Sequence, residues 1–81
     1  MSTDDIRELE VLAEIEGRSD ITRVRLVEIR RREYIDVRKF YRSSDGTWKP
    51  TAKGIVLSPD QVAGAIKGLT SGLLQMGVKY P

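Results

Sequence analysis

Apolar and polar residues alternate along much of this chain, with the period of two that is typical of β-strands. Between residues 9 and 16, Leu, Val, Ala and Ile occupy the odd positions, and Glu occupies three of the four even positions. This pattern predicts a half-buried strand that has one acidic face. A helix that begins at Ile6 and uses Leu9 and Leu12 is the competing interpretation of the same segment.

A second strand is predicted over residues 22–30. The pattern places the aliphatic side chains of residues 24 and 26 toward a core. Arg23 and Arg25 lie on the opposite face. Near Val27 the aliphatic positions change from even to odd numbers, which predicts a β-bulge at this point.

A third strand is predicted from residue 34 to about residue 41. Its aliphatic residues 35 and 37 would face the core, whereas Asp36 and Arg38 would face away from it. Phe40 and Tyr41 are adjacent, so their rings point to opposite faces of a regular strand. We therefore expect one of these rings in the core and the other exposed.

The connections between the strands differ in how clearly the sequence marks them. The segment Arg30–Glu33 holds no Gly, Asn or Asp, which leaves its turn type open. In contrast, Ser43-Ser44-Asp45-Gly46 is a strong turn signal. After a loop that contains Pro50, the aliphatic residues 55–57 predict a short fourth strand.

A helix is predicted over residues 59–76. Ser58 is a suitable N-cap, Pro59 suits the first turn, and Gln61 completes a capping box. Gly77 marks the end. Apolar residues recur at helical spacing and form one face: Val62, Ile66, Leu69, Leu73 and Met76. Beside this face lie three glycines, which indicate either close contact with a partner helix or a weak helix held by packing on the sheet: Gly64, Gly68 and Gly72.

These elements predict an α+β fold, with a four-stranded, curved antiparallel sheet followed by one C-terminal helix. A single domain is expected over residues 9–77, with tails at 1–8 and 78–81. A chain of 81 residues buries only about 60% of its unfolded surface, and it has no Cys or His for a disulfide or a zinc site. We therefore expect an oligomer, formed through apolar residues of the helix and the fourth strand: Ile55, Leu57, Ile66, Leu69 and Leu73.

The charges are unevenly distributed along the chain. Residues 1–20 carry a net charge of −5, residues 21–53 carry +6 and residues 54–81 carry +1, which together give +2. Four of the five aromatic residues lie between Tyr34 and Trp48, within the basic segment. Cations neutralise phosphates and rings stack on bases, so this composition favours binding of an unpaired nucleic-acid strand. The alternative is a solvated charged surface, on which Arg38 merely pairs with Asp36 or Glu28.

Several unrelated residue types follow one another at fixed spacing over about a third of the chain: Asp36-Val37-Arg38-Lys39-Phe40-Tyr41, Gly46, Lys49-Pro50, Lys53-Gly54-Ile55-Val56-Leu57 and Pro59-Asp60-Gln61. This motif resembles that of the transcriptional coactivator family named positive cofactor 4. The resemblance implies four antiparallel strands with a C-terminal helix, a homodimer, and binding of single-stranded or melted DNA. The serine-rich tail of eukaryotic members has no counterpart here, so the resemblance is to a prokaryote-style, single-domain member.

The resemblance also implies roles for particular residues. Arg38 and Lys53 correspond to DNA-contacting cations and Tyr41 to a stacking ring. Ile29 and Ala52 depart from the pattern, since the best-known members carry a stacking Phe and a basic residue there. The expected nucleic-acid-binding surface comprises Arg23, Arg25, Arg30, Arg32, Arg38, Tyr41, Trp48, Lys49 and Lys53.

We therefore expect a single-stranded DNA-binding protein with a coactivator-like role, whose partners are a second copy, the DNA and the transcription machinery. An RNA-binding module is one alternative, because no residue is identifiable as a reader of the 2′-hydroxyl group. A protein-interaction domain without nucleic acid is another; it would dock through the glycine-bearing helix or through Leu74.

The absence of His and Cys removes the commonest general base and thiol nucleophile, so no enzyme is expected. No phosphate-binding glycine motif or metal-ligand cluster occurs, so neither a cofactor nor a metal is expected. No segment is apolar enough to span a membrane, and the acidic N-terminus is unlike a signal peptide. These features predict an intracellular protein, in the cytoplasm and at the nucleoid if the source is prokaryotic.

Overall fold

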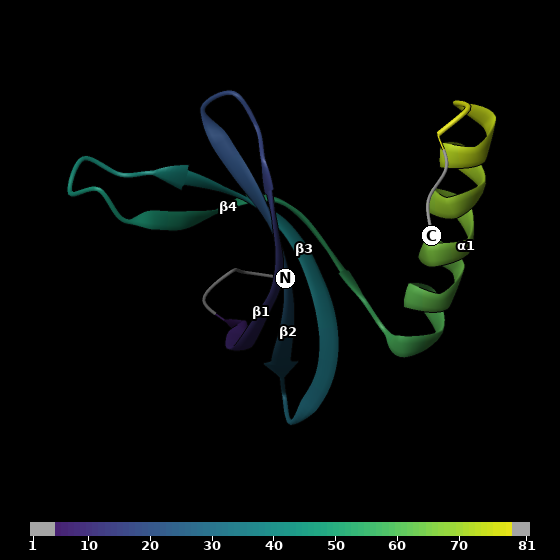
Figure 1. Cartoon of the computed structure of the whole chain (residues 1–81). Helices are drawn as coiled ribbons and strands as arrows, with labels where there is room; N and C mark the ends of the chain where they lie inside the picture. The colour runs from purple at the N-terminus through teal and green to yellow at the C-terminus, as the bar shows by residue number, and fades with distance from the viewer. Residues whose placement is uncertain (1–4, 79–81) are drawn as a thin grey trace.

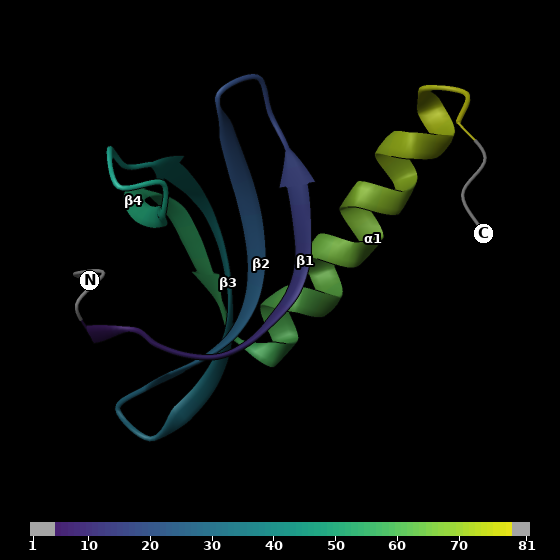
Figure 2. The ribbon, with the colours of Figure 1, turned by 60° about the vertical axis from the view of Figure 1, so that its left-hand side comes forward.

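The computed structural model describes residues 5–78 and contains four strands followed by one helix (Figure 1). The strands form one antiparallel sheet in the order β1-β2-β3-β4, and this sheet is strongly curved (Figure 2). The predicted α+β fold is thus confirmed. The elements are β1 (Arg7–Glu16), β2 (Asp20–Ile29), β3 (Arg32–Arg42), β4 (Trp48–Leu57) and α1 (Pro59–Gln75).

The described residues include only part of the two predicted tails, 1–8 and 78–81. β1 begins at Arg7, inside the segment that was predicted to be the N-terminal tail. Residues 1–4 and 79–81 of the two predicted tails lie outside the described residues. Between residues 5 and 78, no helix is both long enough and apolar enough to cross a membrane.

β2 and β3 pair in one uninterrupted register, from Asp20 opposite Tyr41 to Ile29 opposite Arg32. The bulge predicted near Val27 is therefore not in β2; the register shift at this point lies in β1, between Glu8 and Glu10, which pair with Val27 and Leu26. Val27 and Ile29 are both buried, and they lie on the same face of β2 as the arginines. The apolar pattern changes phase because this face mixes aliphatic side chains with arginines that are paired to acids, not because the strand is irregular.

The β2–β3 hairpin has two different faces. We call one the arginine face; it carries Ile21, Arg23, Arg25, Val27 and Ile29 of β2, with Asp36, Arg38 and Phe40 of β3. The opposite, apolar face carries Val24, Leu26, Ile35 and Val37, which are all half-buried. The prediction that Asp36 and Arg38 face away from the core is wrong, since they are only 0% and 6% exposed. Their face can be buried because the carboxylate neutralises neighbouring guanidinium groups.

β1 follows the predicted alternation only in part. Its pairing with β2 shifts between Glu8 and Glu10 and again between Val11 and Ala13. Each such bulge inserts one residue and moves the following side chains to the other face. Val11 therefore lies opposite Arg25 on the arginine face, whereas Ala13 lies on the apolar face. The single apolar row predicted for this strand is wrong.

β4 is longer than predicted, because it begins at Trp48 and includes Pro50. It is an edge strand, where a missing backbone N–H group is tolerated. Its pairing with β3 shifts between the pairs Arg38–Gly54 and Phe40–Pro50. The additional residues of β4 form a bulge, in which the hydroxyl group of Thr51 donates a hydrogen bond of 2.7 Å to the carbonyl of Lys39.

α1 begins at Pro59, as the sequence predicts, and ends at Gln75, one residue earlier than predicted, with Met76 as its C-cap. The backbone N–H of Ser58 donates to Oε1 of Gln61 at 2.9 Å, and Gly77 follows the helix with a φ of 78°. The helix contacts β3 and β4, but it leans away from the sheet (Figure 1), and none of its residues is buried. In the single chain, the helix is therefore not held by packing along the sheet.

Candidate nucleic-acid interface

A buried carboxylate holds two guanidinium groups at the centre of the arginine face. Asp36 accepts a hydrogen bond of 2.6 Å from Nη2 of Arg25, and its other oxygen lies 2.9 Å from Nη2 of Arg38. Nη1 of Arg38 also donates to the carbonyl of Thr51 at 2.9 Å. Only 7% of each arginine side chain is exposed. Both guanidinium groups are therefore fixed in place, and each presents only a small part of its surface to solvent.

Phe40 supports the arginines from within the same face. Its ring is buried, and its centroid lies 4.7 Å from Cζ of Arg23 and 4.9 Å from Cζ of Arg25. A cation near an aromatic face is attracted by the ring quadrupole. Phe40 therefore acts as a platform that positions two cations.

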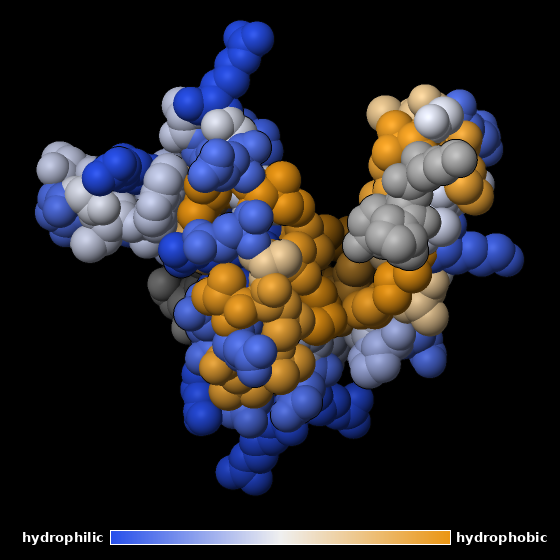
Figure 3. Space-filling view, viewed as in Figure 1, coloured by the Kyte–Doolittle hydropathy of each residue, from blue (hydrophilic) through white to orange (hydrophobic). Residues whose placement is uncertain are grey.

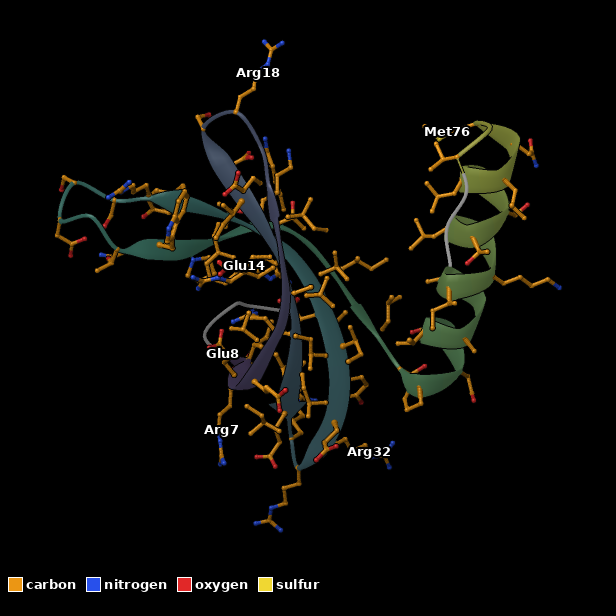
Figure 4. All side chains as sticks on the ribbon, in the orientation of Figure 1. Arg7, Glu8, Glu14, Arg18, Arg32 and Met76 are labelled. Carbon is orange, nitrogen blue, oxygen red and sulfur yellow. The ribbon has the colours of Figure 1, made fainter. Side chains whose placement is uncertain are left out.

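Two acids of the neighbouring strand β1 also contact arginines of the arginine face. Glu14 lies 2.9 Å from Nε of Arg23, and Glu8 lies 3.1 Å from Nη1 of Arg25; both acids are labelled in Figure 4. The pair of Arg38 with Asp36, which the sequence suggested, is confirmed, but the two partners in β1 and the second bond of Asp36 to Arg25 were not predicted. The acidic row in β1 is visible in the sequence, but its pairing with particular arginines depends on the strand register and on two bulges.

The remaining expected cations are exposed and lie at two other places. Arg30 lies in the β2–β3 turn, where Arg30 and Arg31 adopt left-handed conformations with φ values of 51° and 68°, and Arg32 is the first residue of β3. Lys49 and Lys53 are exposed on β4. The structure therefore distributes the expected cations along the sheet and does not gather them in a single pocket.

The two expected rings lie on different faces. Tyr41 is 48% exposed whereas Phe40 is buried, which confirms that one ring lies in the core and one is exposed. Tyr41 pairs with Lys49 on the side of β3 that is opposite the arginine face. Trp48 pairs with Arg42, on the same side of the sheet as Phe40. Trp48 and Arg42 line a hollow of about 320 Å³ beside the β1–β2 turn. Trp48 and Tyr41 thus offer stacking surfaces at the two sides of one hairpin.

The residues expected at a dimer interface extend the apolar face. Ile55 and Leu57 lie opposite Val37 and Ile35. Figure 3 shows apolar side chains on the sheet and on the part of the helix that faces it. Leu57 and Leu73 are half-buried, and three side chains are largely exposed: Ile55 at 54%, Ile66 at 60% and Leu69 at 71%.

Comparison with known proteins assigns this arrangement to a family. Residues 17–64 match the model of the family described as Transcriptional Coactivator p15 (PC4). The structure is similar to a PC4 homologue from Burkholderia pseudomallei, in its tetragonal crystal form, with a TM-score of 0.72 and 30% identity, over 78% of this chain and 94% of that one. With the orthorhombic crystal form of the same homologue, the TM-score is 0.67 and the sequence identity is 29%, over 82% of this chain and 89% of that one. No curated protein sequence matches this chain.

The matched segment contains β2, β3, β4 and the start of α1, which are the elements that carry the motif, and β1 lies before it. The family match covers more than half of the chain, and the solved homologue has the same fold. The chain therefore belongs to the family of the transcriptional coactivator p15 (PC4), which is the positive cofactor 4 family that the motif resembles.

Proposed function

We propose that this protein binds single-stranded or melted DNA through its curved sheet and serves a coactivator-like role in transcription. The observation that supports the proposal is that one curved sheet carries fixed and exposed cations together with two rings, Trp48 on the side of the arginine face and Tyr41 on the opposite side of the same hairpin. Arg23, Arg25 and Arg38 lie at the centre, with Lys49 and Lys53 on β4 and with Arg30 and Arg32 at one end. Phosphates would follow the cations while bases stack on Tyr41 and Trp48.

The buried and the exposed cations have different roles in this proposal. Arg25 and Arg38 are held by Asp36, so they provide a fixed positive field, and about 7% of each side chain is exposed to solvent. Exposed cations such as Lys53 make phosphate contacts that cost little to form. Because neither set reads base edges, the binding is expected to tolerate many sequences.

We also propose that two copies associate through the apolar face and α1. The helix of a single chain leaves Ile66 and Leu69 largely exposed. An apolar hollow of about 320 Å³ lies between the sheet and the helix start, and its lining includes Leu26, Ile35 and Val62. A second copy that covers these surfaces would bury them and stabilise a small domain. The arginine faces, which lie on the opposite side of each sheet, would remain accessible.

A titration with three ligands tests the proposed function. Binding of oligo-dT, oligo-U and a DNA duplex of equal length is measured by fluorescence anisotropy at low salt. A duplex hides the faces of its bases, so the proposal predicts the tightest binding for oligo-dT and the weakest for the duplex. Equal binding of oligo-dT and the duplex would contradict the stacking mechanism.

Two other outcomes of the same titration identify the alternative functions. A clear preference for oligo-U would favour an RNA-binding module that uses the same surface. Absence of binding to all three ligands, with the fold intact, would favour a protein-interaction domain. In the proposed function the protein acts inside the cell, in the cytoplasm and at the nucleoid if its source is prokaryotic.

A further inference from the structure

Two kinds of carboxylate contact the arginines of the arginine face. Asp36 is completely buried and bridges Arg25 and Arg38, so it cannot leave without exposing the core. Glu14 and Glu8 are different, because their side chains are 49% and 41% exposed. Solvent reaches both carboxylates, so they can turn away from their arginines without exposing the core, although the side chains of Arg23 and Arg25 are themselves only 20% and 7% exposed.

The exchangeable acids occupy positions at which an arginine would meet a phosphate. Glu14 lies 2.9 Å from Nε of Arg23, and Glu8 lies 3.1 Å from Nη1 of Arg25. Carboxylate and phosphate oxygens accept the same charge-assisted hydrogen bonds from a guanidinium group. A phosphate and a glutamate therefore compete for the same donor atoms on these two arginines.

The two bulges of β1 determine which of its acids take part. Glu8 and Glu14 lie opposite Val27 and Arg23, which belong to the arginine face. Glu10 lies between the bulges and opposite Leu26, on the apolar face. The strand that presents these acids precedes the segment that matches the family model, which begins at residue 17.

We propose that Glu14 and Glu8 act as internal substitutes for phosphate, so that β1 limits the affinity of the arginine face for nucleic acid. The inference rests on the proposed function. In the unbound protein the two acids keep Arg23 and Arg25 ordered. A bound strand displaces the acids, and their carboxylates then turn toward solvent. Glu14 and Glu8 are thus affinity-determining residues that act through the arginines.

Matched variants of β1 test the proposal. Glu14→Gln removes the competing charge opposite Arg23, whereas Glu10→Gln removes an equal charge from the same strand on the other face. Oligo-dT affinity is measured by fluorescence anisotropy at low salt. We expect Glu14→Gln to tighten binding by about threefold to tenfold, and we expect Glu10→Gln to have a clearly smaller effect, which reflects net charge alone.

The same measurement in an Arg23→Ala background shows whether Glu14 acts through Arg23. There the effect of Glu14→Gln should fall to that of Glu10→Gln, because no guanidinium group remains to be released. Glu8→Gln, which acts through Arg25, provides a second test if Glu14→Gln fails to fold. The thermal midpoint of each variant confirms that the fold is kept.

The outcomes separate this inference from the proposed function. If Glu14→Gln and Glu10→Gln change affinity equally, or if Glu14→Gln weakens binding, the competition is disproved while the proposed function stands. If the wild-type protein binds no oligo-dT, the proposed function fails and this inference fails with it.

Discussion

The side chain of Arg38 fills the space in which a side chain at position 54 would lie. A β-carbon on Gly54 would be 2.6 Å from Cζ of Arg38 and 2.9 Å from its Cβ. The guanidinium group can move aside, but Cβ of Arg38 is attached to the backbone of β3. Gly54 is therefore required for β3 and β4 to pair closely while the side chain of Arg38 lies over β4 and bonds to Asp36, two residues away on its own strand.

Replacement of this glycine should destabilise the protein. We expect Gly54→Ala to lower the free energy of unfolding by about 1–3 kcal/mol, which is typical of overpacking at a close contact. Urea denaturation measures the change. Gly64→Ala is the matched control, because a β-carbon there meets nothing within 4 Å. That change should raise the stability by about 1 kcal/mol, since alanine favours the helix. Equal stability of Gly54→Ala and the wild type would disprove the packing argument.

The β2–β3 turn should become more stable when its arginines are replaced. Arg30 and Arg31 both have positive φ values, a geometry that favours Asn-Gly and costs other residues about 1–3 kcal/mol each. Arg30→Asn combined with Arg31→Gly should raise the free energy of unfolding by about 1–2 kcal/mol. Thermal unfolding measures this effect.

The same pair of substitutions should weaken oligo-dT binding, because it removes two cations from the end of the sheet. The dependence of log affinity on log salt should become shallower by about 0.7 for each phosphate contact that is lost. Arg30→Lys combined with Arg31→Lys keeps both charges and the strained backbone, so it should change neither stability nor binding strongly. Unchanged affinity in the Asn-Gly variant would remove this turn from the proposed interface.

The proposed dimer depends on the apolar side of α1. Leu69→Glu places a charge on a side chain that is 71% exposed in the single chain and that a partner copy would bury. We expect dissociation together with loss of stability, because so small a domain is marginal alone. Sedimentation velocity at micromolar concentration measures the association. Ser71→Glu adds the same charge two residues away, on the opposite side of the helix, and should leave the dimer intact. A wild-type protein that is monomeric and well folded would contradict the proposal.

The β3–β4 turn should show an unusual titration. The Ser43 hydroxyl group, followed by the Thr47 hydroxyl and backbone N–H groups, donates to Asp45 and lowers its pKa from 3.8 to about 2. Because the folded pKa is depressed, this stabilisation is present above pH 3.8 and is lost as the pH falls toward 2. NMR titration of the Asp45 carboxyl should show the low midpoint, and Ser43→Ala should raise it. A midpoint near 3.8 in the wild type would disprove these hydrogen bonds.

The elements of the fold could be predicted from sequence because their signals are local. The capping residues Ser58 and Gln61 marked the helix start, and the alternation of polarity marked the strands. The bulges could not be located in this way, since they depend on how β1 and β4 pair with their neighbours. Residues 51–53 form the bulge of β4, but Thr-Ala-Lys is an ordinary run of polar and small residues that gives no local signal of a bulge.

The arginine face was misassigned for a related reason. Arg25 and Arg38 have the polarity of surface residues, but Asp36 neutralises them and lets their face be buried. A polarity pattern records each residue separately and does not record an ion pair between adjacent strands. The motif predicted that Arg38 contacts DNA. The structure shows in addition that Arg38 is buried and forms an ion pair with the buried Asp36. Arg38→Ala would leave a buried carboxylate with one partner fewer, so it would perturb folding as well as binding.

The most direct test of the central claim therefore uses exposed residues. Oligo-dT affinity is measured for Lys53→Ala combined with Tyr41→Ala, and for the control Lys67→Ala, which removes an exposed cation from the helix. The account predicts that the double variant loses a phosphate contact and a stacking contact, the latter contributing about 1–3 kcal/mol, while the control binds as the wild type does. If the folded double variant binds oligo-dT as tightly as the wild type, this surface is not the binding site and the proposed function is wrong.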